Sequence, residues 1–229
     1  MASSGLRFGA ANFLSSQVGL KSPLWKRWAN GKRSPLTVPN EGRTETMQVS
    51  INPAARDLKD SDERYTPYQN AFPVDAVREL VWPNVLGGDE REWIPQREGV
   101  DFKPLCLGVT QGYFVNLLRV RKSGVLSRHY HPSPVHAYVL KGRWFYLEHD
   151  WVAEEGSYAM EPPGETHTLI VPEDVTEMIT LFHVTGAYIY VDPRGNAVGI
   201  EDVFSKLAQA RRHYEQIGLG ADYVKRYIR

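Results

Sequence analysis

Cysteine is almost absent from this sequence, since Cys106 is the only one among 229 residues. A single cysteine excludes a disulfide within the chain and argues against a metal site built on cysteines. The count also fits a reducing compartment. We therefore expect a cytoplasmic location.

An excess of charge and long apolar runs are also lacking. Lys plus Arg and Asp plus Glu both number 27, so there is no electrostatic case for nucleic acid or an acidic membrane surface as partner. No stretch of about 18 apolar residues occurs, and no membrane span is predicted. With 42% apolar and 24% charged residues, most of the chain should form a globular domain.

Acidic residues are missing from positions 1–40, which contain six Lys or Arg and many serines. This composition is typical of an organellar transit peptide, and mitochondrial import is one expectation. A disordered tail, or an extension upstream of a true start at Met47, stays open as an alternative. Residues 1–60 lack periodicity and are assigned to a disordered or transit-like N-terminal extension.

The chain after residue 60 is typical of an all-β domain. From Glu92 onward, short apolar or alternating runs are separated by turn residues. Strands of about four to eight residues at roughly ten-residue spacing indicate a barrel or sandwich. No internal repeat is visible, which favours a single barrel over a double one. We place this barrel, with a lead-in that includes a short helix or strand at 74–81, in residues 61–199. The expected strands are 113–120, 135–140, 144–148, 157–160, 168–171, 177–184 and 188–191.

The last 30 residues change to a helical pattern. Asp202 or Ser205 is a candidate N-cap, and Gly218 and Gly220 are candidate stops. We assign residues 200–229 to a C-terminal helical segment, with helices over 200–217 and 221–228. The apolar residues on one stripe of the first helix are Val203, Leu207, Ala210, Tyr214 and Ile217.

Three of the seven histidines have the spacing of metal ligands. His129 and His131 stand at i and i+2, so on a strand both imidazoles point to the same face. His167 follows the rigid turn at 162–164, which directs it back towards the first pair. Three neutral imidazoles are good ligands for divalent Fe, Zn, Ni or Cu. The sequence therefore predicts one divalent metal ion on His129, His131 and His167.

These motifs resemble those of the cupins. The cupin pattern is a glycine, HxH, three or four residues, a glutamate, six residues and a glycine, and then a second motif, G-x5-PxG-xx-H-xxx-N. Gly124–Gly142 follows the first motif and Gly156–His167 the second, except that Val171 stands at the final Asn position. The resemblance covers about residues 92–192. It implies a single cupin barrel, a double-stranded β-helix or jelly roll, and a homodimer, since cupins commonly dimerise.

The first motif departs from the cupin pattern at its glutamate. Preserving the distance to Gly142 puts Val135 at the position where cupins usually place a ligating glutamate. Counting one residue further puts His136 there, as a fourth ligand. The first interpretation predicts three histidines with no carboxylate, a site that keeps the full +2 charge and open coordination positions. Such a site favours an anionic, bidentate oxygen ligand such as an enolate, a diketonate or an α-hydroxyketone.

Longer segments are similar to the 2,4'-dihydroxyacetophenone dioxygenase family. This similarity spans about residues 65–229 and implies a non-haem Fe(II) enzyme of aromatic compound catabolism. With O2, such enzymes cleave the side chain of an aromatic hydroxyketone to 4-hydroxybenzoate and formate. The segments that carry the similarity are Ser127–Trp144, Asp150–Tyr158, Glu161–His167, Thr180–Gly186 and Gly218–Arg229.

A substrate with an acidic C–H beside a carbonyl benefits from a base. Glu148 is one candidate because period two puts it on the strand face of Trp144, and Glu161, before the Pro-Pro turn, is another. Tyr138 is a candidate hydrogen-bond donor to a substrate oxygen. The competing interpretations are a solvated strand residue for Glu148 and core packing for Tyr138.

Two other functions remain open at this stage. Three histidines also accept zinc, which would fit a cupin sensor or regulatory domain like that of anti-sigma factors. Those domains usually retain the glutamate that Val135 replaces, and their partner-binding zinc domain is not visible here. A cupin enzyme acting on sugars or thiols is the third possibility. The six Trp and twelve Tyr count modestly against it, since they suit a pocket for an aromatic ligand.

Overall fold

The computed structural model describes residue 73 and residues 75–229. The N-terminal extension predicted for residues 1–60 lies outside this part of the chain. Residues 75–81 form neither a helix nor a strand, so the expected short element was wrong. Its Val77 and Val81 side chains are 65% and 71% exposed, so they bury no apolar face that would hold a regular element in place. Among the described residues, no helix has the length and apolar character needed to cross a membrane.

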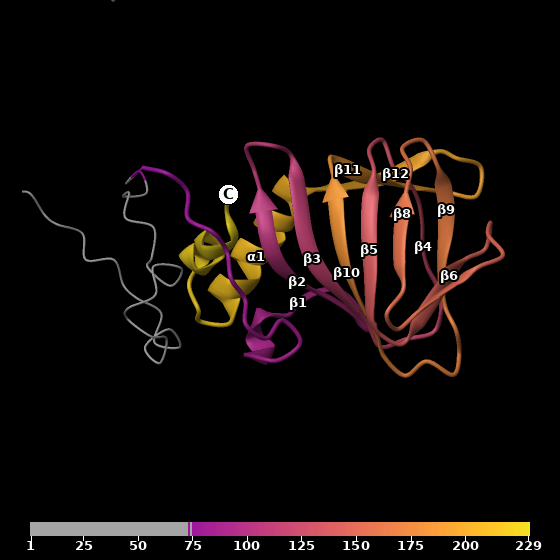
Figure 1. The fold of residues 1–229 in the computed structure, drawn as a ribbon, viewed down its shortest axis with the longest axis horizontal. Helices are drawn as coiled ribbons and strands as arrows, with labels where there is room; N and C mark the ends of the chain where they lie inside the picture. Colours follow the sequence, from indigo (N-terminus) through magenta and orange to yellow (C-terminus); the bar gives the residue numbers. More distant parts are fainter. Residues whose placement is uncertain (1–72, 74) are drawn as a thin grey trace, which may run out of the picture. The chain divides into compact units, whose positions relative to one another are not determined.

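The described residues form two six-stranded antiparallel sheets, which together make a jelly-roll barrel as predicted (Figure 1). The first sheet contains, in spatial order, β1 (Ile94–Arg97), β2 (Val100–Gly108), β3 (Tyr113–Val120), β10 (Met178–Thr185), β5 (Val135–Lys141) and β8 (Tyr158–Glu161). The second contains β12 (Ala197–Asp202), β11 (Ala187–Val191), β4 (Gly124–Tyr130), β9 (Thr166–Val171), β6 (Arg143–Tyr146) and β7 (Val152–Glu154).

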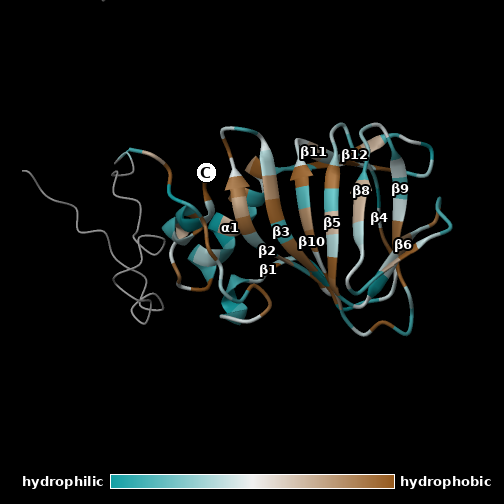
Figure 2. Ribbon diagram, viewed as in Figure 1, coloured by the Kyte–Doolittle hydropathy of each residue, from teal (hydrophilic) through white to brown (hydrophobic). Residues whose placement is uncertain are grey.

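Alternation along the strands divides the residues between the core and the outer surface. On β5, Val135, Ala137 and Val139 are buried, whereas Tyr138 between them is exposed. Figure 2 shows the same alternation as hydrophobic and hydrophilic bands along β5 and β10. Period-two burial is the expected outcome for an antiparallel sheet with one face on the core. The inward face of each strand therefore supplies the lining of the barrel.

The seven strands expected from the sequence are present, with ends that match or are shifted by at most two residues. The main error lies at residues 197–202, where we expected the helix to begin at 200. These residues instead form β12, paired with β11 at Ile189↔Ile200. Few side chains of this strand are buried, so its sequence lacks the alternation of apolar and polar residues that predicts a strand. Its pairing is decided by the neighbouring strand rather than by local pattern.

Two helical elements follow, and they lie beside β1 and β2 (Figure 1). Helix α1 (Val203–Gln216) begins with a capping box in which Asp202 and Ser205 each accept from the backbone of the other. Of the two predicted candidates, Asp202 is the N-cap and Ser205 is its partner at N3. Its buried Ala210 and Tyr214 join the core. The predicted second helix is a 3-10 helix, η5 (Ala221–Tyr227), and a short 3-10 turn, η4 (Glu90–Glu92), precedes β1.

Candidate metal centre

The structure brings the three predicted histidines together inside the barrel. His129 lies on β4 and is paired directly with His167 on β9, and His131 follows the end of β4. The ring centroids are 4.8 Å apart for His129 and His131, 4.9 Å for His129 and His167, and 5.0 Å for His131 and His167. The turn after β8 therefore returns His167 to the first pair, as its spacing predicted.

A carboxylate, Glu161, joins this cluster. Its Oε2 lies 3.0 Å from Nε2 of His131 and 3.5 Å from Nε2 of His167. One ligand atom from each of the four side chains lies within 4.8 Å of the others. The expectation of a cluster without a carboxylate was thus wrong. Position Val135 does lack one, but its cross-strand partner on β8 is Glu161, which supplies the carboxylate instead.

The four side chains fit a divalent cation. All are buried, and Oε2 of Glu161 has no hydrogen-bond partner among the described residues. A buried carboxylate without a compensating charge costs several kcal/mol. Nε2 of His131 and Nε2 of His167 face each other at 3.0 Å, so both nitrogens are directed at the same space. A bound cation would satisfy all of these groups at once.

Burial keeps His129 and His167 in the neutral form that binds metals. It lowers the pKa of His129 well below 6.5, and the nearby His131 and His167 lower it further. Burial also lowers the pKa of His167 to about 3, with smaller contributions from His131 and His149. A neutral imidazole offers a lone pair without competition from a proton. These two imidazoles are therefore ready for metal binding at neutral pH.

Neighbouring groups orient the ligands. Oγ of Ser127 lies 3.0 Å from Nδ1 of His129, and the ring of Tyr146 stacks on His167 with centroids 3.6 Å apart. Tyr146 also donates to Oε1 of Glu161 at 2.7 Å, which leaves Oε2 towards the histidines. Glu165, 3.9 Å from Nδ1 of His167, is held by His149 at 2.7 Å. Such partners fix the ring orientation of ligating histidines.

The cluster opens onto a pocket with an empty volume of about 530 Å³, which includes its open mouth. Its walls are mainly apolar and aromatic, a composition typical of small-molecule sites. Three polar residues that sequence reasoning missed, Gln96, Arg97 and Asn116, also line it. The apolar and aromatic lining includes Leu118, Leu126, Leu169, Phe182, Val184 and Tyr188.

Two of the predicted catalytic side chains are not brought to the cluster. β6 ends at Tyr146, so the period-two pattern does not continue to Glu148, whose carboxylate accepts from the backbone N–H and hydroxyl of Thr168 at 2.7 and 2.9 Å. Tyr138 is 45% exposed on the outer face of β5. Neither residue lines the pocket. Of the three candidates, only Glu161 lies beside the histidines.

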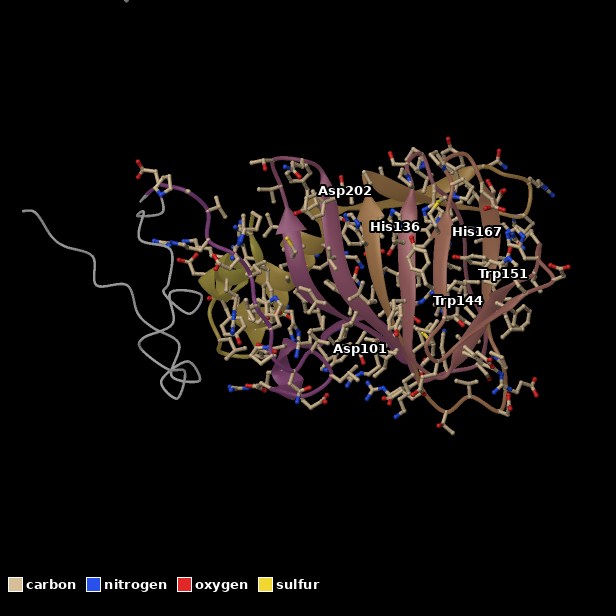
Figure 3. The ribbon with its side chains drawn as sticks, in the orientation of Figure 1. Asp101, His136, Trp144, Trp151, His167 and Asp202 are labelled. Atoms are coloured by element: carbon tan, nitrogen blue, oxygen red, sulfur yellow. The ribbon has the colours of Figure 1, made fainter. Side chains whose placement is uncertain are left out.

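His136, the alternative fourth ligand, also lies outside the cluster. Its Nδ1 is 2.7 Å from the hydroxyl of Tyr158, and its ring stacks on His183. Figure 3 labels His136 on β5 and His167 on β9, which belong to different sheets. Strand parity explains the difference, because Val135 points inward and its neighbour must point out.

Comparison with known proteins shows the kind of domain. Residues 84–189 match the model of the ChrR Cupin-like domain. No curated protein matches the chain. The chain thus contains a cupin-like domain, as the HxH and PxGxxH motifs predicted. The finer resemblance to 2,4'-dihydroxyacetophenone dioxygenases is not confirmed by these matches.

Solved structures support the same fold. An RmlC-like cupin protein from Ralstonia eutropha JMP134 is 26% identical, with a TM-score of 0.52 over 59% of this chain and 90% of that one. An acetylacetone dioxygenase from Acinetobacter johnsonii is 15% identical, with a TM-score of 0.53 over 65% of this chain and 99% of that one. The described domain therefore has the cupin fold.

Proposed function

We propose that this protein is a mononuclear Fe(II) dioxygenase that cleaves a C–C bond in an aryl hydroxyketone, such as 2,4'-dihydroxyacetophenone, or in a diketone. The observation that carries the proposal is a buried cluster of three histidines and Glu161 that opens onto an apolar, aromatic-lined pocket. The acetylacetone dioxygenase among the structural neighbours supports a diketone or hydroxyketone substrate.

Bound iron would supply an electron source for O2 and a Lewis acid for the two substrate oxygens. His129, His131 and His167 would hold it through their ring nitrogens. The apolar walls exclude water from the reacting carbons, which strengthens every electrostatic interaction inside the pocket. These walls also suit an aryl ring better than a sugar.

Glu161 is the proposed proton acceptor. Its Oε1 is engaged by the hydroxyl of Tyr146, and its Oε2 faces the cluster without a hydrogen-bond partner in the described chain. A carboxylate at this place can take the acidic proton beside the substrate carbonyl, which forms the enolate that chelates a metal. The same oxygen can instead act as a fourth metal ligand, and the iron-loaded protein distinguishes these two roles.

The test is anaerobic reconstitution with Fe²⁺, followed by oxygen-electrode assays with 2,4'-dihydroxyacetophenone and simple β-diketones. We expect O2 uptake with at least one of them and, for the hydroxyketone, 4-hydroxybenzoate and formate as products. His167→Ala should lose this activity, whereas the matched variant His136→Ala, on the outer face, should keep it. Absence of O2 uptake with all substrates, together with stoichiometric zinc in the purified protein, would refute the proposal.

A second candidate function is a zinc-binding sensor or regulatory domain. The match to the ChrR Cupin-like domain favours it, and Glu161 supplies the carboxylate whose absence at Val135 argued against it. Four protein ligands close a zinc site more completely than three. Zinc retained through purification, with no iron-dependent O2 uptake, would favour this function over the dioxygenase.

A further inference from the structure

Two polar side chains at the end of β1 line the pocket without touching the metal ligands. β1 pairs with β2 at Pro95↔Asp101 and Arg97↔Val100, so Gln96 is the extra residue of a β-bulge. Adjacent residues on a regular strand point to opposite faces, but a bulge re-aims them. Gln96 and Arg97 both line the pocket, which a regular strand would not allow.

Arg97 brings a positive charge that has no carboxylate partner among residues 75–229. Within the described part of the chain it forms no ion pair, and its Nη2 donates to the backbone carbonyl of Leu126. A guanidinium has five N–H donors, so this bond leaves others available. Arg97 also lines a second, adjoining hollow together with Gln96 and Tyr190. It therefore lies where the pocket meets the outside.

Gln96 brings an acceptor that has no donor within the part of the chain that the structure describes. Its Nε2 donates to Oε2 of Glu201 at 2.6 Å, and the hydroxyl of Tyr190 donates to the same oxygen at 2.7 Å. An ionised carboxylate only accepts, so the amide nitrogen must face Glu201 and the orientation of the amide is fixed. Its Oε1 is left buried and without a partner among the described residues. A buried acceptor in this state is unfavourable, and a ligand donor would relieve it.

We propose that Gln96 and Arg97 form a hydroxyl-binding subsite that selects a phenolic substrate. A phenol donates to Oε1 of Gln96 and accepts from the guanidinium of Arg97, so it satisfies both groups together. An aryl ether has no proton for Gln96, and a carboxylate would place negative charge towards Oε1 of Gln96 and the nearby Glu201. The subsite thus distinguishes phenols from ethers and from acids.

The subsite is displaced from the metal ligands along the direction of β4. Arg97 is bonded to Leu126, and His129 lies three residues further along that strand. At about 3.3 Å per residue this separates the two positions by roughly 10 Å. This inference rests on the proposed function. The expected substrate is then an aryl ketone with its chelating group at one end of the ring and a phenolic hydroxyl at the other.

The test measures binding to the metal-free full-length protein, so it does not depend on catalysis. The probes are 4-hydroxyacetophenone, 4-methoxyacetophenone and 4-acetylbenzoate, titrated by NMR. We expect the phenol to bind at least ~10-fold more tightly than the ether and the acid, as is typical for a hydrogen bond to a charged donor. Arg97→Met and Gln96→Leu should each reduce this preference to about twofold or less.

Arg143→Met is the matched control, because Arg143 is a surface arginine paired with Asp174. It should keep the preference for the phenol. Equal binding of the three probes, tightest binding of 4-acetylbenzoate, no binding of any probe, or a preference that survives Arg97→Met would each overturn the subsite. Gln96→Leu also removes a hydrogen-bond partner of Glu201 and could therefore unfold the protein. In that case the result for Arg97→Met alone decides whether the subsite exists.

The outcomes separate this subsite from the proposed function. An iron-loaded protein without O2 uptake refutes the dioxygenase but leaves the measured preference for the phenol intact. A protein that oxidises hydroxyl and methoxyl substrates with equal kcat/KM, and binds both probes equally, keeps the dioxygenase and loses the subsite. Where both hold, Arg97→Met should raise KM for the phenolic substrate and change kcat little, because the subsite touches the far end of the ring.

Discussion

The carboxylate of the candidate metal centre comes from a neighbouring strand rather than from the strand that usually carries it in cupins. Val135 and Glu161 face each other across β5 and β8. A side chain at either position points into the same space, since directly opposed residues lie on one face of the sheet. Glu161 can therefore replace the carboxylate missing at Val135 without any change of backbone. What matters to a metal ion is the position of the oxygen atom, not the strand it comes from.

Removing the negative charge of Glu161 tests this view. Glu161→Gln keeps the size of the side chain but replaces a carboxylate with a neutral amide. We expect affinity for Zn²⁺ to fall by at least ~10-fold, because even the loss of a group that only supports a metal ligand costs about 10- to 100-fold. Titration calorimetry of the chelator-stripped protein measures it. Glu148→Gln, whose carboxylate binds Thr168, is the control and should leave the affinity unchanged.

His167 should be essential for metal retention. His167→Ala removes a nitrogen at the centre of the cluster and should abolish metal retention, with the barrel still folded. Metal content after purification and the circular dichroism spectrum test the two parts of this prediction. His136→Ala should retain metal, because that ring lies against Tyr158 and His183. A His167→Ala protein that keeps its metal would exclude His167 from the site.

Among the elements, the positions of the three histidines could be predicted from the sequence because strand parity and turn geometry are local. Glu148 was predicted on the face of Trp144 because the sequence gives no sign that β6 ends at Tyr146. Gln96 and Arg97 could not be predicted because a bulge depends on the register between two strands, which a single strand does not encode. Residues 200–202 likewise belong to β12 and not to the predicted helix, because β12 pairs with β11.

Gly142, the last glycine of the first cupin motif, lies at the turn between β5 and β6. Gly142 has φ +71°, and a Cβ there would lie 2.6 Å from the carbonyl oxygen of Glu177. Gly112 has nearly the same φ, +70°, but a Cβ there meets nothing within 4 Å. Gly112→Ala should cost about 1 kcal/mol from the backbone conformation alone. Gly142→Ala should cost a further ~1–3 kcal/mol, because the clash must move backbone.

Denaturant unfolding of the two glycine variants measures these free energies. Both variants incur the same penalty for a positive φ. The difference between their free energies of unfolding therefore reports the close approach of the segment around Glu177. Equal destabilisation would mean that this segment moves freely, and the motif glycine would then serve only the turn.

At the scale of the whole molecule, a buried ion pair joins the C-terminal helix to the barrel. Nζ of Lys206 lies 2.9 Å from Oε1 of Glu201, and both side chains are almost inaccessible. The ammonium also lies 4.0 Å from the ring centroid of Phe102. Burial raises the pKa of Glu201, but Lys206 and the hydrogen bonds from Tyr190 and Gln209 lower it more, so the net pKa is below 4.5. The carboxylate therefore stabilises the fold above about pH 4.5 and loses this contribution as pH falls.

Lys206→Met should reverse that dependence. Without the ammonium, burial dominates and the pKa of Glu201 rises. We expect a loss of about 3–5 kcal/mol at neutral pH, as is usual when one partner of a buried pair is removed. Part of it should return as the pH falls towards the raised pKa. Adding Glu201→Gln should recover part of the stability at neutral pH. A loss that is constant with pH, measured by urea unfolding, would mean that Lys206 acts through packing alone.

Metal binding should stabilise the whole barrel, because the four side chains of the cluster come from elements of both sheets. Glu161 ends β8 in the first sheet, whereas His129 and His167 belong to β4 and β9 in the second. A ligand that binds only the folded state, at 100 times its Kd, adds about 2.7 kcal/mol. For a domain of this size that corresponds to a rise in Tm of roughly 5–10 °C. Calorimetry with Zn²⁺ and with a chelator should show this difference in the wild type and none in His131→Ala. An equal shift in that variant would mean that the metal stabilises the protein from another place.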